Sequence, residues 1–293
     1  MAPASSWLSA GEATRLALLG AAAALWLEPV WTTLRYGQID ILIGALILYD
    51  LSRADSSRFK GAAIGLAIGI KLTPAIFAVY LLLTRRYRAA ANSLAVFATT
   101  VAVGFLAIPS DARAYWGGAF IDPGRVGRIE NAANQALRGA YARLLHSTSV
   151  ELWWLASGVI VGAVGMGLAA RAGRRGDDVQ GYCLCALSGL LISPISWSHH
   201  WVLAIPALML FGLGSLRRAT RAGTAGGVLV AVLGYAHVIW WVPVNHPRHS
   251  ELHLDPIQLA WADAYVLVGL LALLAALTRG WPWGRSPPIP RGA

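Results

Sequence analysis

Apolar residues along this chain occur in runs of 13–20, each ended by a short polar or basic stretch. A helix needs about 20 residues to cross the hydrocarbon core of a bilayer. The runs lack the polar–apolar alternation of strands, and only helices or closed barrels satisfy their backbone hydrogen bonds in lipid. The pattern therefore predicts an all-α, polytopic membrane protein. The expected spans are residues 13–31, 39–51, 89–108, 151–170, 179–194, 201–214, 225–243 and 260–278.

One apolar stretch, residues 61–83, departs from this pattern. It is interrupted in the middle by "KLTP", Lys71 to Pro74, and its two flanks, "SSRFK" and "TRRYR", are both basic. A single span cannot have both ends on the same side of the membrane. We therefore expect two short helices that form a re-entrant hairpin with "KLTP" at its tip. A charged residue at that depth is a candidate functional residue, although a lysine that snorkels to the interface is the alternative.

The charged residues indicate how the chain is oriented. The 293-residue chain carries a formal charge of +10, but only 13% of its residues are charged and 57% are hydrophobic. Fifteen of the 24 basic residues gather in five short segments: Arg53, Arg58 and Lys60; Arg85, Arg86 and Arg88; Arg171, Arg174 and Arg175; Arg217, Arg218 and Arg221; Arg279, Arg285 and Arg291. The positive-inside rule places such segments in the cytoplasm. The charge thus reflects membrane topology, not nucleic-acid binding, and we expect a multi-pass protein of the plasma (inner) membrane.

Residues 109–150 are too polar for a span and too long for a tight connector, so they are expected to form an outer segment. We expect a single transmembrane domain over residues 1–280. The Pro-rich residues 281–293 are expected to be a disordered cytoplasmic tail.

Four polar groups are expected on the outer side or at the hairpin tip. They are Arg35, Tyr36, Gln38 and Asp40 in "RYGQID"; Lys71; Asn134, Gln135 and Arg138 in "NQALRG"; and His199, His200 and Trp201 in "SPISWSHHW". Arginine and lysine hold phosphate through charge-assisted hydrogen bonds. Side-chain amides bind hydroxyl groups, and aromatic rings pack on the apolar face of a sugar. The set suits a ligand that contains both a phosphate and a sugar.

Each group also has a simpler interpretation. Arg35 and the arginines of the outer segment could contact lipid headgroups, most tryptophans could form interface belts, and Asn134 and Gln135 could brace their loop. The histidine pair could bind a metal. However, adjacent helical side chains point about 100° apart, and the sequence places no cysteine or carboxylate beside the pair. No metal site is therefore predicted.

Four stretches, "LEPVWTTLRYGQIDILIGALILYDL", "GIKLTPAIFAVYLLLTRR", "NQALRG" and "SPISWSHHWV", resemble a known family in order and spacing. The chain is similar, over roughly residues 20–280, to actinobacterial members of glycosyltransferase family 87, which are polyprenol-phosphate-mannose-dependent α-(1→2)-mannosyltransferases. The resemblance implies a GT-C-type helical bundle. It also implies inverting, metal-independent transfer of mannose, without a cofactor, from polyprenyl-phosphate-mannose. The acceptor would be an α-mannan or glycolipid on the outer face, such as lipomannan, lipoarabinomannan or a phosphatidylinositol mannoside.

The resemblance also assigns expected roles. Lys71, Arg35 and one or both histidines would contact the donor phosphate. Asn134, Gln135 and Arg138 would order the outer segment or bind sugar hydroxyls, Gln38 and Asp40 would shape the cavity, and Tyr36 and Trp201 would line the sugar or lipid groove.

The chain departs from the family pattern in two ways. Asp40 stands where the family pattern has asparagine. The family's catalytic aspartate lies in an N-terminal region that this chain is expected to lack, so the base is unassigned. The chain would then be part of an active transferase or a shortened, inactive homologue. The rival class is a transporter or flippase for a lipid-linked sugar, which often has inverted repeats that this sequence does not show.

Overall fold

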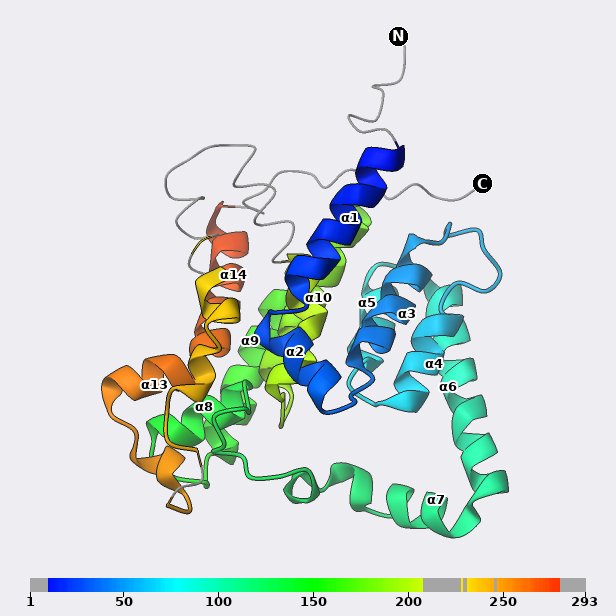
Figure 1. The fold of residues 1–293 in the computed structure, drawn as a ribbon. Helices are drawn as coiled ribbons and strands as arrows, with labels where there is room; N and C mark the ends of the chain where they lie inside the picture. Colours follow the sequence, from blue (N-terminus) through cyan, green and yellow to red (C-terminus); the bar gives the residue numbers. More distant parts are fainter. Residues whose placement is uncertain (1–9, 208–227, 229–230, 245–246, 280–293) are drawn as a thin grey trace.

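The computed structural model describes residues 10–207, 228, 231–244 and 247–279. Regular structure over these residues is helical throughout, and two residues form an isolated bridge, Asn134 with Trp197. The predicted all-α fold is confirmed. Figure 1 shows the helices gathered into a bundle, with the outer segment passing along its lower edge from α7 to α8.

Among the described residues, two helices are long and apolar enough to cross a membrane: α6 (Tyr87–Ala107) and α9 (Glu151–Arg174). They confirm the predicted helices over 89–108 and 151–170. The shorter helices α3 (Asp40–Ser52) and α10 (Asp178–Ile192) correspond to the predictions for 39–51 and 179–194. Most of α10 is buried, so this helix forms the centre of the core.

Two further predicted spans are bent. Residues 13–31 fall in α1 (Ala10–Ala24) and α2 (Glu28–Arg35), which meet at 74°, and residues 260–278 fall in α13 (Pro256–Ala262) and α14 (Ala264–Arg279), which meet at 71°. The prediction of continuous helices was wrong at both places. Pro29 occupies the first turn of α2, where a residue without an N–H is tolerated, but it cannot extend α1 because it has no N–H to donate to the Leu25 carbonyl. At the second bend, the Asp263 side chain is held by Arg143. The part of the chain that the structure describes thus has two candidate spans, or up to four if each bent pair is one span.

Residues 61–83 form the expected helical hairpin. Helices α4 (Ala62–Ile70) and α5 (Ala75–Leu83) have nine residues each, which is about 13 Å and less than half a bilayer core. Lys71 to Pro74 form the break between them. At the opposite end, Arg86 Nε after α5 lies 3.2 Å from Asp55 Oδ1 before α4. The two ends of the hairpin therefore lie together, and "KLTP" is its tip.

Glycines let α4 press directly against α6. A Cβ atom on Gly61 would lie 1.8 Å from the Ala89 carbonyl oxygen, and one on Gly65 would lie 2.4 Å from that of Ser93. One on Gly69 would lie 2.3 Å from Thr100 Oγ1. Small residues at this spacing allow close helix approach in membrane proteins. The glycines of "GAAIGLAIG" thus form a seam that fixes α4 along α6 (Figure 1).

Asp50, near the end of α3, caps the start of α4. Its fully buried carboxylate accepts hydrogen bonds from the backbone N–H groups of Gly61 (2.6 Å), Ala63 (2.7 Å) and Ile64 (3.1 Å). Replacing a side chain that caps a helix N-terminus by alanine costs about 0.5–2 kcal/mol. We expect Asp50→Ala to lower the free energy of unfolding by about 2 kcal/mol or more, since three donors lose their acceptor. Asp50→Asn, which keeps one acceptor oxygen, should lose less. Denaturant titration in detergent micelles measures both, and equal losses would contradict the capping role.

Residues 109–150, the expected outer segment, contain short helices and no candidate span. The helices are α7 (Pro109–Trp116), η1 (Ala119–Ile121), η2 (Pro123–Arg125) and α8 (Leu137–Leu144). The later chain contains η3 (Ser198–Ala204), η4 (Val238–Trp240) and η5 (Ser250–His253). Residues 201–207 of the span predicted over 201–214 are described and begin in η3. The rest of that span and the predicted tail, 281–293, lie outside the described residues, as do several residues of 225–243.

Candidate functional site

The hairpin tip meets the start of α3 and the histidine pair of η3. Lys71 Nζ donates hydrogen bonds to Asp40 Oδ1 (2.8 Å) and Oδ2 (3.2 Å). His199 Nε2 lies 4.0 Å from Asp40 Oδ2, and the rings of His199 and His200 pack edge to face with centroids 4.6 Å apart. Residues from three places in the sequence thus form one cluster, which we call the tip cluster: Asp40, Lys71, His199 and His200.

The tip cluster is organised by charge and burial. Asp40 is buried in the first turn of α3, where the helix dipole favours a carboxylate. The Lys71 side chain is 24% exposed, so the ammonium group is the more accessible half of the ion pair. Pro74 has no N–H and disfavours helix in the residue before it, which explains why α4 and α5 separate here.

Both histidines are neutral at pH 7. Burial lowers the pKa of His199 to about 4; the Asp40 carboxylate opposes this shift and the Lys71 ammonium adds to it. Burial also places the pKa of His200 well below its usual value, and the charge of Lys71 acts in the same direction. Each neutral imidazole has one N–H donor and one acceptor nitrogen.

The sequence-based reasoning about metal ligands was wrong on one point: a carboxylate does lie beside the histidine pair. Asp40, His199 and His200 each offer a ligand atom, and these atoms lie within 4.8 Å of one another. However, the Lys71 ammonium group is bonded to both Asp40 oxygens. A metal cation there would displace it or lie beside a like charge. The donor set of ammonium and imidazole N–H groups is better suited to an anion.

The "RYGQID" stretch contributes unevenly to the tip cluster. The half-exposed ring of Tyr36 packs edge-on against His199, with centroids 6.2 Å apart. Arg35, the last residue of α2, and Gln38 are both exposed. Within the described part of the chain, no side-chain hydrogen bond or ion pair engages either of them. Both side chains remain available to a ligand.

Asn134 and Gln135 are buried and bonded to backbone groups. Asn134 Oδ1 accepts from the Ser196 N–H (2.9 Å), and its Nδ2 donates to the Ile129 carbonyl (2.9 Å). Gln135 Nε2 donates to the Ala132 and Ala262 carbonyls. These bonds tie the outer segment to the "SPISWSHHW" stretch and to α13. In this conformation the geometry fits the bracing interpretation of the two amides better than sugar binding.

Gly139, the glycine of "NQALRG", lets α8 pack closely against Asn134. A Cβ atom on Gly139 would lie 2.5 Å from the Asn134 carbonyl oxygen, so α8 can approach Asn134 only with glycine at this position.

Trp201 and Arg138 lie around this brace. Trp201 is buried, donates from Nε1 to the Gln135 carbonyl (3.1 Å) and packs against Tyr265. Arg138 pairs with Glu151 (2.8 Å) and lies over the Trp154 ring. Both side chains therefore already have protein partners.

Glu28 holds η3 in place, and the sequence analysis did not identify it as a site residue. Its carboxylate is fully buried and accepts hydrogen bonds from four side chains: Thr32 Oγ1 (2.8 Å), Ser198 Oγ (2.8 Å), Trp240 Nε1 (3.0 Å) and Tyr265 OH (2.9 Å). Ser198 directly precedes the histidine pair. Thr33, which follows Thr32 in α2, donates a hydrogen bond to the His199 carbonyl (3.1 Å). A single carboxylate at the end of an apolar run, before a proline, was the available signal.

A small cavity lies behind His200. It has a volume of about 20 Å³ and is bordered by His200, Ser196 and residues of α5 and α10, which is room for one water molecule. The buried Ser196 hydroxyl has no hydrogen-bond partner among the described residues. His200 is therefore the histidine of the tip cluster that borders this cavity, and both histidines are buried.

The pKa of His199 predicts a pH-dependent stability. In the unfolded chain the imidazole protonates near pH 6.5, whereas in the folded protein it stays neutral to about pH 4. Acidification therefore favours the unfolded state. The contribution of neutral His199 to the free energy of unfolding is fully present above pH 6.5 and is lost as the pH falls toward about 4. His199→Asn should reduce the difference in melting temperature between pH 7.5 and pH 5, while the exposed His253→Asn should leave it unchanged. An equal pH dependence in all three proteins would contradict this account.

Comparison with known proteins shows the family of this chain. The model for glycosyltransferase family 87 matches residues 2–194. A phosphatidylinositol pentamannoside mannosyltransferase of Mycolicibacterium smegmatis, described as polyprenol-phosphate-mannose-dependent and alpha-(1-2), is 37% identical over 272 residues, covering 91% of this chain and 63% of the relative. A protein of the same description from Mycobacterium tuberculosis is 38% identical over 270 residues, covering 90% of this chain and 60% of the relative.

A third relative, a phosphatidylinositol mannoside mannosyltransferase of M. tuberculosis, is 34% identical over 272 residues, with 89% of this chain and 62% of the relative covered. The chain thus spans about three fifths of the length of these relatives. No solved structure gave a significant match. With two thirds of its residues matched by the family model, the chain belongs to glycosyltransferase family 87.

Proposed function

We propose that this protein is a membrane mannosyltransferase that uses polyprenyl-phosphate-mannose as its donor and binds the donor phosphate at the tip cluster. The single observation that carries the proposal is that Lys71 and His199 both meet Asp40 at the hairpin tip. Family membership and the names of the relatives support the same donor.

Each side chain has a role that its contacts support. The Lys71 ammonium group uses two of its donors on Asp40, and its third is free to bind a phosphate oxygen. The neutral His199 imidazole adds an N–H donor beside it. Arg35 supplies a second cation from the end of α2, and the exposed Tyr36 ring offers a face for the sugar or for the first isoprene units.

The chemistry follows from this arrangement. The acceptor hydroxyl oxygen bonds to the anomeric carbon as the bond from that carbon to the phosphate oxygen breaks, which inverts the configuration. Charge develops on the departing lipid phosphate, where Lys71 and His199 stabilise it electrostatically. A general base takes the hydroxyl proton, and we assign that role to no residue of this chain. We place the reaction on the outer face, opposite the basic loops. The acceptor is a glycolipid or α-mannan, the first being the class named in the relatives.

The proposal is tested with the chain reconstituted in nanodiscs and radiolabelled polyprenyl-phosphate-mannose. Donor binding is measured first, and mannose transfer to added phosphatidylinositol mannosides second. His199→Ala/His200→Ala should lower donor affinity, whereas His253→Ala, which removes an exposed imidazole elsewhere, should not. Absence of donor binding by the unaltered chain, or unchanged binding in the double variant, would overturn the proposed site.

A further inference from the structure

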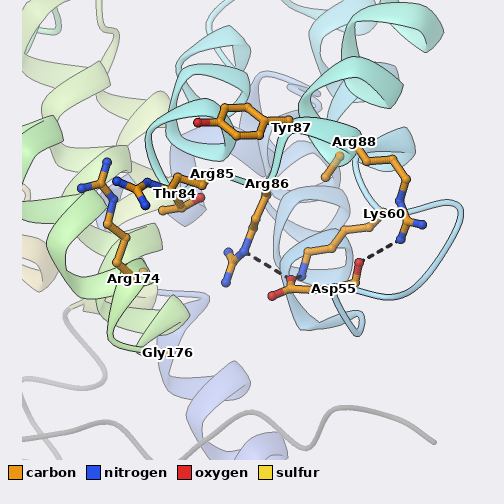
Figure 2. Close-up of a pocket in the computed structure, with 11 residues that line it drawn as sticks. Asp55, Lys60, Thr84, Arg85, Arg86, Tyr87, Arg88, Arg174 and Gly176 are labelled. Carbon is orange, nitrogen blue, oxygen red and sulfur yellow. Dashed lines mark hydrogen bonds and ion pairs between the residues drawn. The ribbon is translucent and has the colours of Figure 1, made fainter.

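A second site lies at the end of the hairpin opposite the tip cluster. A pocket of about 710 Å³ opens among the α3–α4, α5–α6 and α9–α10 loops (Figure 2). Five cations line it, together with one carboxylate: Lys60, Arg85, Arg86, Arg88 and Arg174, with Asp55. The pocket is therefore strongly basic.

Two of these cations are neutralised within the protein. Arg86 forms a bidentate pair with Asp178 (2.6 and 2.9 Å) and also contacts Asp55. The buried Lys60 pairs with Asp55 at 2.7 Å. These two carboxylates therefore balance Arg86 and Lys60, and they hold the three loops together.

The other cations keep donors free. Arg174 uses its Nε on the Leu83 carbonyl (2.8 Å), and Arg88 uses one Nη on the carbonyls of Asp55 and Ser57. Arg85 makes no side-chain hydrogen bond or ion pair within the described ranges. In Figure 2 the Arg85 and Arg174 side chains point toward one another. Two guanidinium groups that line one pocket repel each other unless an anion lies between them.

The backbone gives a second reason to look at Arg85. This residue follows the last turn of α5 with φ of 62°, in the left-handed region. Its N–H donates to the Leu82 carbonyl, and the next N–H, of Arg86, donates to the Leu81 carbonyl, both at 2.9 Å. Glycine is the usual residue in this type of helix ending, because any side chain is strained there. Strained residues of this kind concentrate at functional sites.

An apolar groove continues from the basic pocket. It has a volume of about 530 Å³ and is bordered by Leu83, Ala163, Met166, Gly167 and Ala170, with Arg171, Arg174 and Arg175 at its basic end. Arg174 borders both hollows. The groove runs on α9, a candidate span of which 17% of the apolar window is buried by the protein. A groove on such a surface faces lipid.

From these features we propose that the pocket and groove together bind one anionic glycerophospholipid. Its phosphate lies between Arg85 and Arg174, and one acyl chain lies along the groove on α9. The positive-inside rule assigns this end of the molecule to the cytoplasmic leaflet, where anionic lipids attract basic residues. The lipid ties the α5–α6 loop to the end of α9 and so fastens the base of the hairpin whose tip carries Lys71. The proposal does not depend on the donor or on the reaction.

The test uses the full chain in detergent with phosphatidylglycerol as the probe. Native mass spectrometry counts bound lipid, and melting temperature reports stabilisation. We expect the unaltered chain to retain one phosphatidylglycerol molecule and to melt at a higher temperature with it. Arg85→Gly removes the guanidinium group and relieves the left-handed backbone, so this variant should be at least as stable without lipid. Its lipid affinity should fall about tenfold or more, as expected for a charge-assisted hydrogen bond.

Two other variants distinguish the contribution of the lipid headgroup from that of its acyl chain. Gly167→Leu fills the groove, since a Cβ atom there meets nothing within 4 Å, and it should weaken lipid binding without changing charge. Arg58→Gln removes one charge from the same end of the molecule but outside the pocket, and should bind lipid normally. Glycerol 3-phosphate should give no comparable stabilisation. Equal stabilisation by glycerol 3-phosphate would show that the site binds a soluble phosphate, and undiminished lipid binding by Arg85→Gly would equally overturn the proposal.

Discussion

Lys71→Met is expected to weaken donor binding about ten- to a hundredfold and to destabilise the protein. The substitution removes the cation proposed to hold the donor phosphate, and loss of a hydrogen bond between charged groups costs about 1.5–3 kcal/mol of binding free energy. It also leaves Asp40, which is 1% exposed, as a buried carboxylate without its ion-pair partner. Breaking a buried pair from one side costs about 3–5 kcal/mol. The measurements are donor binding in nanodiscs and unfolding in detergent.

Two companion variants distinguish the binding role of Lys71 from its role in stability. Asp40→Asn keeps the ammonium group and frees it from its carboxylate, so donor binding should be retained or strengthened. Lys71→Met/Asp40→Asn removes both charges and should recover most of the stability but none of the donor binding. Donor binding by the double variant at the level of the unaltered chain would show that Lys71 does not contact the phosphate.

Arg143→Met is expected to have the largest effect on stability outside the tip cluster. Arg143 is fully buried; its Nε donates to Asp263 at 3.0 Å, and its Nη atoms donate to the carbonyls of Glu130, Asn131 and Asn134. The substitution leaves a nearly buried carboxylate and three carbonyls without their donor. We expect a loss of about 3–5 kcal/mol, measured by denaturant titration.

The matched control is Arg125→Met, which removes an exposed arginine of the same outer segment that donates to the Ala119 carbonyl. Exposed interactions of this kind contribute less than about 1 kcal/mol. Arg143→Met should also make the backbone around Asn134 accessible to protease or to hydrogen exchange, while Arg125→Met should not. If both variants unfold at the same denaturant concentration, Arg143 does not organise the segment.

The fold could be predicted from the sequence where the limits of a helix depend on the local pattern of apolar and polar residues. The limits of α6 and α9 follow from hydropathy, and the hairpin tip follows from "KLTP" between two basic flanks. The bend at Asp263 could not be predicted from hydropathy, because the Asp263 side chain is held by Arg143, 120 residues away. The bend at Leu27 was missed although Pro29 stands two residues after it. Hydropathy averages over a window and does not register a single tertiary ion pair.

The candidate site was predictable in composition but not in geometry. Charge and polarity singled out Lys71 and the histidines, and the structure brings them together. The side-chain amides of Asn134 and Gln135 are not part of this cluster, because they bond to backbone groups. The central role of Glu28 depends on donors as far away as residue 265. Such partners appear only once the chain is folded.

The glycine seam between α4 and α6 has a mechanical consequence for the hairpin. Because Gly61 and Gly65 face backbone carbonyls of α6 with no room even for a methyl group, α4 cannot swing or slide without losing this fit. Lys71, which directly follows α4, is therefore held in a fixed position by this packing. Entry of the proposed donor should leave the distance between α4 and α6 unchanged. Spin labels on α4 and α6 should report the same separation with and without added polyprenyl-phosphate-mannose.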